Sequence, residues 1–137
     1  MAKKSIWLDR GLVFGPYFCL CLSEKSFHRE LKKFGVGKKD RPDFLSGPYA
    51  DATCHHFQHE AKRASACIVC LRDWKSKALP CVLGLLIHEG THVWQSALQN
   101  MEEKDPSPEF EAYAIQNICQ ELIDSFFAQT KIKVKIK

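Results

Sequence analysis

The stretch 79–99 constrains the fold of this chain more than any other. Apolar side chains recur there at helical spacing and cover most of the surface, and Pro80 fits the first turn of a helix. A helix that is apolar on most sides must be buried against other elements. Any polar strip on it must therefore open onto a cleft or remain unsatisfied. The sequence predicts a long, buried helix with a functional polar strip.

That polar strip contains His88, Glu89 and His92 in an H-E-x-x-H pattern. About 100° per residue places the two histidines about 40° apart, one turn from each other, so both imidazoles can bind one zinc ion. Glu89 lies beside the pair, where its carboxylate can take a proton from a zinc-activated water. Gly90 falls on the packed side, which predicts a close approach by a neighbouring element. The pattern favours a zinc-dependent hydrolase with Glu89 as general base.

A catalytic zinc site needs a third protein ligand, and the next predicted helix offers two candidates. This helix runs from Pro108, after the N-cap Ser107, to about residue 129. Glu109 and Glu111 lie on opposite margins of its predicted apolar face, so periodicity does not choose between them. The helix dipole also favours acids in a first turn, so the alternative is that both are structural. That apolar face consists of Ala112, Ile115, Cys119, Leu122 and Phe126.

The pairing of H-E-x-x-H on one helix with E-x-E-A at the start of the next resembles the gluzincin metallopeptidases. In that family the first glutamate of the E-x-x-A pattern is the third zinc ligand, which implies Glu109 here. Gluzincins commonly have Asp or Asn after the alanine, where this chain has Tyr113. The stretch 87–116 also resembles small metallopeptidases encoded by phages and prophages.

The resemblance implies an α+β, zincin-like domain, in which a small antiparallel or mixed sheet packs on the active-site helix and a C-terminal helix. It implies one zinc ion per chain, with His88, His92 and Glu109 as ligands, and hydrolysis of a peptide bond in a protein or peptide substrate aligned along an edge strand. Tyr113 is a candidate donor to the transition state, with Tyr49 behind it. The alternative is a non-catalytic accessory or binding protein of phage type, with the same fold and a structural or vestigial zinc site.

The remaining elements are predicted from local patterns. In chain order they are a strand from about Tyr17, a helix over 24–34 after the N-cap Ser23, and a hairpin of strands over 52–59 and 64–71. The tail 131–137 alternates Lys with Ile or Val, which fits an edge strand and a frayed basic end equally well.

Length, composition and charge indicate a single globular domain and limit its partners. A chain of 137 residues, with 45% hydrophobic and 26% charged residues, is typical of one globular domain, here 1–137. The net charge of +4 comes from lysines near the two ends, including the tail 131–137, so we expect no nucleic-acid partner. The sequence shows neither a membrane span nor a signal-peptide pattern, so we expect a cytoplasmic protein, in the host cytoplasm if phage-encoded. It does not indicate an oligomeric state.

The chain has seven cysteines, an odd number that predicts reduced, buried thiols. The hairpin cysteines and histidines suggest a second, structural zinc site. Cys67 and Cys70, however, would point to opposite faces of a strand and could not chelate together. Cys81 shares the helical face of His88 and His92 and is expected to line the cleft. The hairpin histidines are expected at its surface or in the cleft, where one can serve as a substitute ligand or an oxyanion donor. The candidate ligands in the hairpin are Cys54, His55, His56, His59, Cys67 and Cys70.

Overall fold

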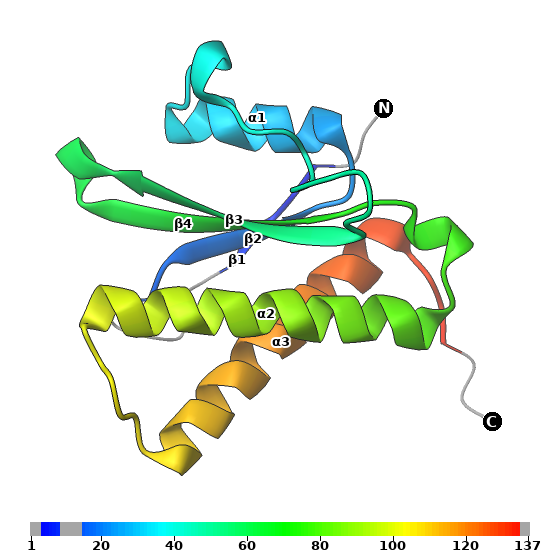
Figure 1. Cartoon of the computed structure of the whole chain (residues 1–137). Coiled ribbons are helices and arrows are strands. Elements are labelled where there is room, and N and C mark those ends of the chain that lie inside the picture. Colours follow the sequence, from blue (N-terminus) through cyan, green and yellow to red (C-terminus); the bar gives the residue numbers. More distant parts are fainter. Residues whose placement is uncertain (1–3, 9–14, 135–137) are drawn as a thin grey trace.

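A four-stranded sheet separates helix α1 from helices α2 and α3, which gives three layers (Figure 1). This computed structural model describes residues 4–8 and 15–134. The strands are β1 (Trp7–Leu8), β2 (Tyr17–Cys21), β3 (Ala52–His59) and β4 (Ala64–Leu71). The α-helices are α1 (Glu24–Phe34), α2 (Leu79–Met101) and α3 (Pro108–Thr130). Short 3-10 turns are η1 (Lys38–Asp40), η2 (Glu60–Lys62) and η3 (Trp74–Ser76). The predicted α+β class and the mixed sheet are confirmed.

The sheet has the order β1-β2-β4-β3, with β2 parallel to β4 and the outer pairs antiparallel. In the central strand β4, Cys67 and Val69 face α2 and α3, whereas Ile68 and Cys70 face α1. Residues 66–71 are therefore all buried, as expected for a strand covered on both faces. The parallel pairing of β2 with β4 and the short strand β1 were not predicted from sequence.

The hairpin of β3 and β4 has the bounds predicted from sequence. Arg63, with φ of 48°, adopts the left-handed conformation that closes the turn. The register pairs Ala52 with Leu71 and His59 with Ala64, so side chains of β3 alternate between the two faces of the sheet. Odd-numbered residues of β3 lie on the α1 side and even-numbered residues lie on the α2 side.

Helix α1 forms because its ends are capped and one face is apolar. The Ser23 hydroxyl accepts a hydrogen bond from the Ser26 N–H, and Gly35, with φ of 92°, ends the helix. Phe27 and Leu31 are fully buried against the sheet. This helix covers the sheet face opposite α2, and its predicted bounds are confirmed.

Helix α3 crosses α2 where α2 has a glycine. A Cβ added to Gly90 would lie 2.7 Å from the Cys119 Sγ, so the missing side chain permits the contact, as the sequence predicted. The predicted apolar face of α3 is wrong at Ala112, which is exposed, while Ala114 and Ile118 are buried. Helix α3 packs mainly against α2 and also contacts β2, and its first turn lies away from the sheet (Figure 1).

Residues 131–134 follow α3 without regular structure, and the rest of the lysine-rich tail lies outside the described residues. None of the helices within the described ranges combines the length and apolar character needed to cross a membrane.

The contact at Gly90 yields a stability prediction. Replacing a helix-interior glycine with alanine normally stabilises a helix by about 1 kcal/mol. We expect that gain for Gly84→Ala, because a Cβ at Gly84 meets nothing within 4 Å. We expect Gly90→Ala to lower the free energy of unfolding by about 1–3 kcal/mol, because the Cβ overlaps the Cys119 thiol. Urea denaturation measures both changes.

Removing the thiol serves as the control. Cys119→Ala in the Gly90→Ala background should recover part of the loss, since it removes the Sγ that the new Cβ meets. Equal stabilisation by the two glycine substitutions would show that α3 does not approach α2 this closely.

Candidate functional site

His88 and His92 lie one turn apart on the outer face of α2, with their rings 4.9 Å apart between centroids. Their Nε2 atoms are 3.2 Å apart. Two imidazole nitrogens bound to one tetrahedral zinc ion at about 2.0–2.1 Å would be about 3.3 Å apart. The two rings are within hydrogen-bond distance of each other, and their separation is close to the one that a shared ion requires.

The second nitrogen of His92 is also held in place. Its Nδ1 lies 2.7 Å from the Gln95 Oε1, and an amide oxygen can only accept a hydrogen bond. In the tautomer that donates from Nδ1 to this oxygen, the Nε2 atom has a free lone pair on the side of His88. Metal-binding histidines are typically oriented by such a hydrogen bond from their other nitrogen.

Glu89 projects from α2 toward the hairpin and is only 5% exposed. Burial raises the pKa of its carboxyl group, whereas the neighbouring His88 and His92 oppose this rise. The carboxylate accepts a hydrogen bond from the backbone N–H of Cys54 in β3. Glu89 is thus a buried carboxylate, more basic than usual, beside the histidine pair.

β3 is an edge strand, and half of its backbone groups point away from β4. The Asp51 carbonyl, just before β3, accepts from the Arg72 N–H, so odd-numbered residues exchange hydrogen bonds with β4. Even-numbered residues such as Cys54, His56 and Gln58 therefore direct their N–H and C=O groups toward the open edge. The hydrogen bond from Cys54 to Glu89 agrees with this alternation.

A cleft of about 690 Å³ lies between the first half of α2 and the start of β3. Its wall is partly apolar, and an ion pair of 3.2 Å between Lys77 and Asp51 lies at one side. Cys81 lines this cleft, as predicted, and Gly84 leaves it open because it has no side chain. The lining residues are Asp51, Ala52, Lys77, Cys81, Gly84, Leu85, His88 and Glu89.

The two candidate third ligands lie on different sides of α3. Glu111 accepts a hydrogen bond of 2.8 Å from the indole of Trp94, so it joins α3 to α2. Glu109 is exposed, and two residues along a helix it lies about 160° from Glu111. Tyr113, one turn after Glu109, is 68% exposed. In this arrangement Glu109 does not join His88 and His92 in a three-ligand cluster among the described residues.

The hairpin histidines are divided between the two sheet faces. His55 lies on the α1 side, where its Nε2 is 2.9 Å from the Phe44 carbonyl oxygen. His59 is also on that side and contacts Phe34. His56 is on the α2 side, with its Nδ1 3.3 Å from the Cys67 Sγ. His56 is therefore the hairpin histidine that shares a face with Glu89.

Cys54, His56 and Cys67 form a cluster that can hold a metal ion, with their ligand atoms all within 4.8 Å of one another. The Cys54 thiol, by hydrogen bonding, lowers the pKa of Cys67 to about 5, with burial acting in the opposite direction. Cys70 faces α1, so its separation from Cys67 is as predicted. All three residues were among the candidate ligands in the hairpin, and the pairing of β3 with β4 brings them together.

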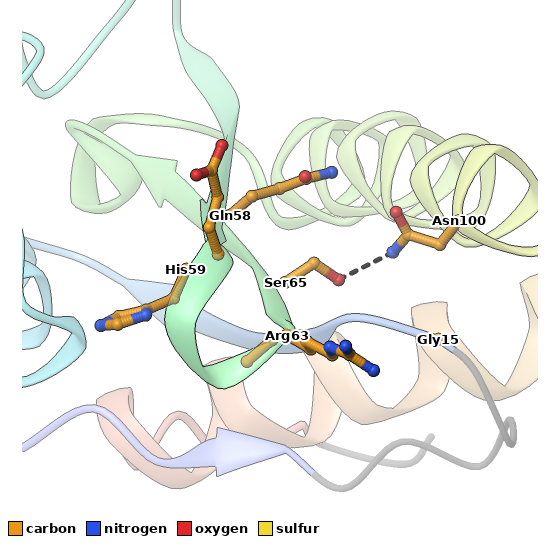
Figure 2. Close-up of a pocket in the computed structure, with 8 residues that line it drawn as sticks. Gly15, Gln58, His59, Arg63, Ser65 and Asn100 are labelled. Carbon is orange, nitrogen blue, oxygen red and sulfur yellow. Dashed lines mark hydrogen bonds between the residues drawn. The ribbon is translucent and has the colours of Figure 1, made fainter.

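A second hollow, of about 470 Å³, lies at the turn of the hairpin (Figure 2). Asn100 of α2 closes one side through a hydrogen bond of 2.7 Å to Ser65. Asn100 is about two helical turns beyond His92, so this hollow is separate from the cleft at the start of α2.

Comparisons with known proteins found no relationship: no family model, no curated protein and no solved structure matches this chain.

The different positions of Glu109 and Glu111 lead to opposite expectations for two variants. We expect Glu111→Ala to lower the free energy of unfolding by about 1–3 kcal/mol, because it leaves the buried Trp94 N–H without an acceptor. We expect Glu109→Ala to change it by less than about 0.5 kcal/mol, because Glu109 is exposed. Urea denaturation of the metal-free protein measures both.

Zinc content tests the role that the resemblance assigns. If Glu109 is the third ligand, Glu109→Ala loses zinc from the histidine site, whereas Glu111→Ala keeps it. Equal zinc retention by the two variants would refute Glu109 as a ligand.

Proposed function

We propose that this chain is a zinc-dependent peptidase with a zincin-like fold, in which His88 and His92 bind one zinc ion and Glu89 is the general base. The observation that carries the proposal is the 3.2 Å between the two Nε2 atoms, beside a buried carboxylate. When bound, zinc supplies a Lewis acid that lowers the pKa of water and polarises a carbonyl group.

Glu89 supports the proposal by its position and its basicity. Burial raises its pKa, which makes the carboxylate a better proton acceptor near neutral pH. The Cys54 N–H holds one side of the carboxylate, so the side chain is oriented before substrate binds. In the proposed reaction Glu89 takes a proton from the attacking water and passes it to the leaving amine.

The open edge of β3 suggests how a peptide would bind. An extended peptide can form main-chain hydrogen bonds with the outward N–H and C=O groups of His56 and Gln58. Such a peptide runs beside α2, and the cleft of about 690 Å³ would take one of its side chains. The substrate class that fits is therefore an extended segment of a protein or peptide.

Two further assignments rest on the resemblance alone. Glu109 is proposed as the third zinc ligand and Tyr113 as a donor to the transition state. Both residues are exposed on the side of α3 away from Trp94. Ligation by Glu109 therefore requires the first turn of α3 to rearrange when metal binds.

The second candidate is a non-catalytic binding protein of the same proposed fold with a structural metal. The observation that favours it is the cluster of Cys54, His56 and Cys67, because ligands drawn largely from thiols are typical of structural zinc sites. The two candidates differ in whether the zinc-loaded chain hydrolyses peptides.

The variant Glu89→Gln separates these candidates. Loss of a general base costs roughly 10²–10⁴-fold in rate, whereas an amide of the same size keeps the fold. We expect zinc-loaded wild-type protein to cleave a mixed peptide library, and Glu89→Gln to lose that cleavage while keeping its zinc. Mass spectrometry of the peptides and elemental analysis of the protein give the two readouts.

Glu103→Gln, an exposed site at the end of α2, is the matched control and should retain full cleavage. Cleavage by Glu89→Gln at the wild-type rate would refute the role of Glu89. A zinc-loaded wild type that cleaves nothing in the library would favour the binding protein.

A further inference from the structure

Three potential metal ligands meet on the face of the hairpin that packs on α2. Cys54 and His56 are two residues apart in β3, so they point to the same side, and His56 is paired directly with Cys67 of β4. The His56 Nδ1 is 3.3 Å from the Cys67 Sγ, and all three ligand atoms lie within 4.8 Å of one another. The antiparallel register thus creates a chelating set from residues distant in sequence.

The distances fit a tetrahedral ion. With zinc–sulfur bonds of about 2.3 Å and zinc–nitrogen bonds of about 2.0–2.1 Å, a sulfur and a nitrogen ligand are about 3.6 Å apart and two sulfurs about 3.8 Å apart. The observed 3.3 Å between His56 and Cys67 differs from this by a few tenths of an ångström. Two thiolates and one imidazole favour zinc over oxygen-seeking cations such as Mg²⁺ or Ca²⁺.

The surroundings of the cluster differ from those of an ordinary buried thiol. Cys67 is fully buried, yet Ser96 of α2 forms a hydrogen bond with its side chain, and the exposed His56 gives access from solvent. Cys70, on the opposite face of β4, lies instead in an apolar cluster with residues such as Phe27.

We propose that Cys54, His56 and Cys67 bind a zinc ion at a second site, separate from His88 and His92 and beside the same Glu89. The Cys54 backbone N–H donates a hydrogen bond to Glu89. His56 lies close enough to lower the pKa of the Glu89 carboxyl group, as His88 and His92 also do. Three protein ligands leave a fourth position for water or for Glu89. The site joins β3 to β4 below α2, and it raises the expected zinc content from one to two per chain.

The test removes the first site before it examines the second. The double variant His88→Ala/His92→Ala is purified under reducing conditions, stripped with a chelator and titrated with Co²⁺ and then Zn²⁺. We expect one ion per chain by elemental analysis and a thiolate-to-cobalt charge-transfer band in the near ultraviolet. Adding His56→Ala, which alters an exposed side chain, should weaken binding by at least about 100-fold.

Matched cysteine variants assign the ligands. In the same background, Cys54→Ser and Cys67→Ala should abolish the charge-transfer band, whereas Cys70→Ala, on the same strand but facing α1, should leave it unchanged. A double variant that binds no metal overturns the proposal, as does a Cys54–Cys67 disulfide that persists in the reduced, metal-free protein. A charge-transfer band that survives both His56→Ala and Cys67→Ala also overturns it. If the wild-type chain binds a single ion, and this ion is held by the hairpin cluster and not by His88 and His92, the proposed peptidase is refuted and the second site is retained.

Discussion

The buried carboxylate of Glu89 is the interaction on which the rest of the site depends. A carboxylate that is 5% exposed is costly unless hydrogen bonds and nearby positive groups compensate for lost water. Here the Cys54 N–H supplies a hydrogen bond, and His88 and His92 lie nearby. This contact joins α2 to the edge strand β3. The histidine pair lies beside it on α2, and the Cys54, His56 and Cys67 cluster lies beside it on the hairpin.

The alternation of β3 then determines which residues can share that environment. Even-numbered residues point toward α2 and direct their backbone groups to the open edge, so Cys54 and His56 lie next to Glu89. Odd-numbered residues point toward α1, so the ring of His55 contacts that of Phe27 and takes no part in the site. A shift of one residue in the register would exchange the two sets and remove both the hydrogen bond to Glu89 and the metal cluster.

Much of the fold could be predicted from sequence, because its signals are local. The caps Ser23 and Gly35 bound α1, and the strands of the hairpin were predicted with their observed ends. The buried position of Gly90 also followed from helical spacing. The parallel pairing of β2 with β4 could not be predicted, because it joins segments some 50 residues apart and leaves no periodic signal. On α3 the predicted apolar face was wrong at Ala112, but it was confirmed at Cys119, Leu122 and Phe126, which are buried.

For the candidate site, the sequence by itself determined the spacing of His88, Glu89 and His92, because a helix brings residues four apart onto one face. It also determined that Cys67 and Cys70 separate, because a strand alternates. Only the tertiary structure decided which glutamate contacts α2 and which thiols meet. Glu111 reaches Trp94 through the crossing of two helices, and Cys67 meets Cys54 and His56 through the register of two strands. Such contacts depend on how whole elements pack, which no spacing within one element specifies.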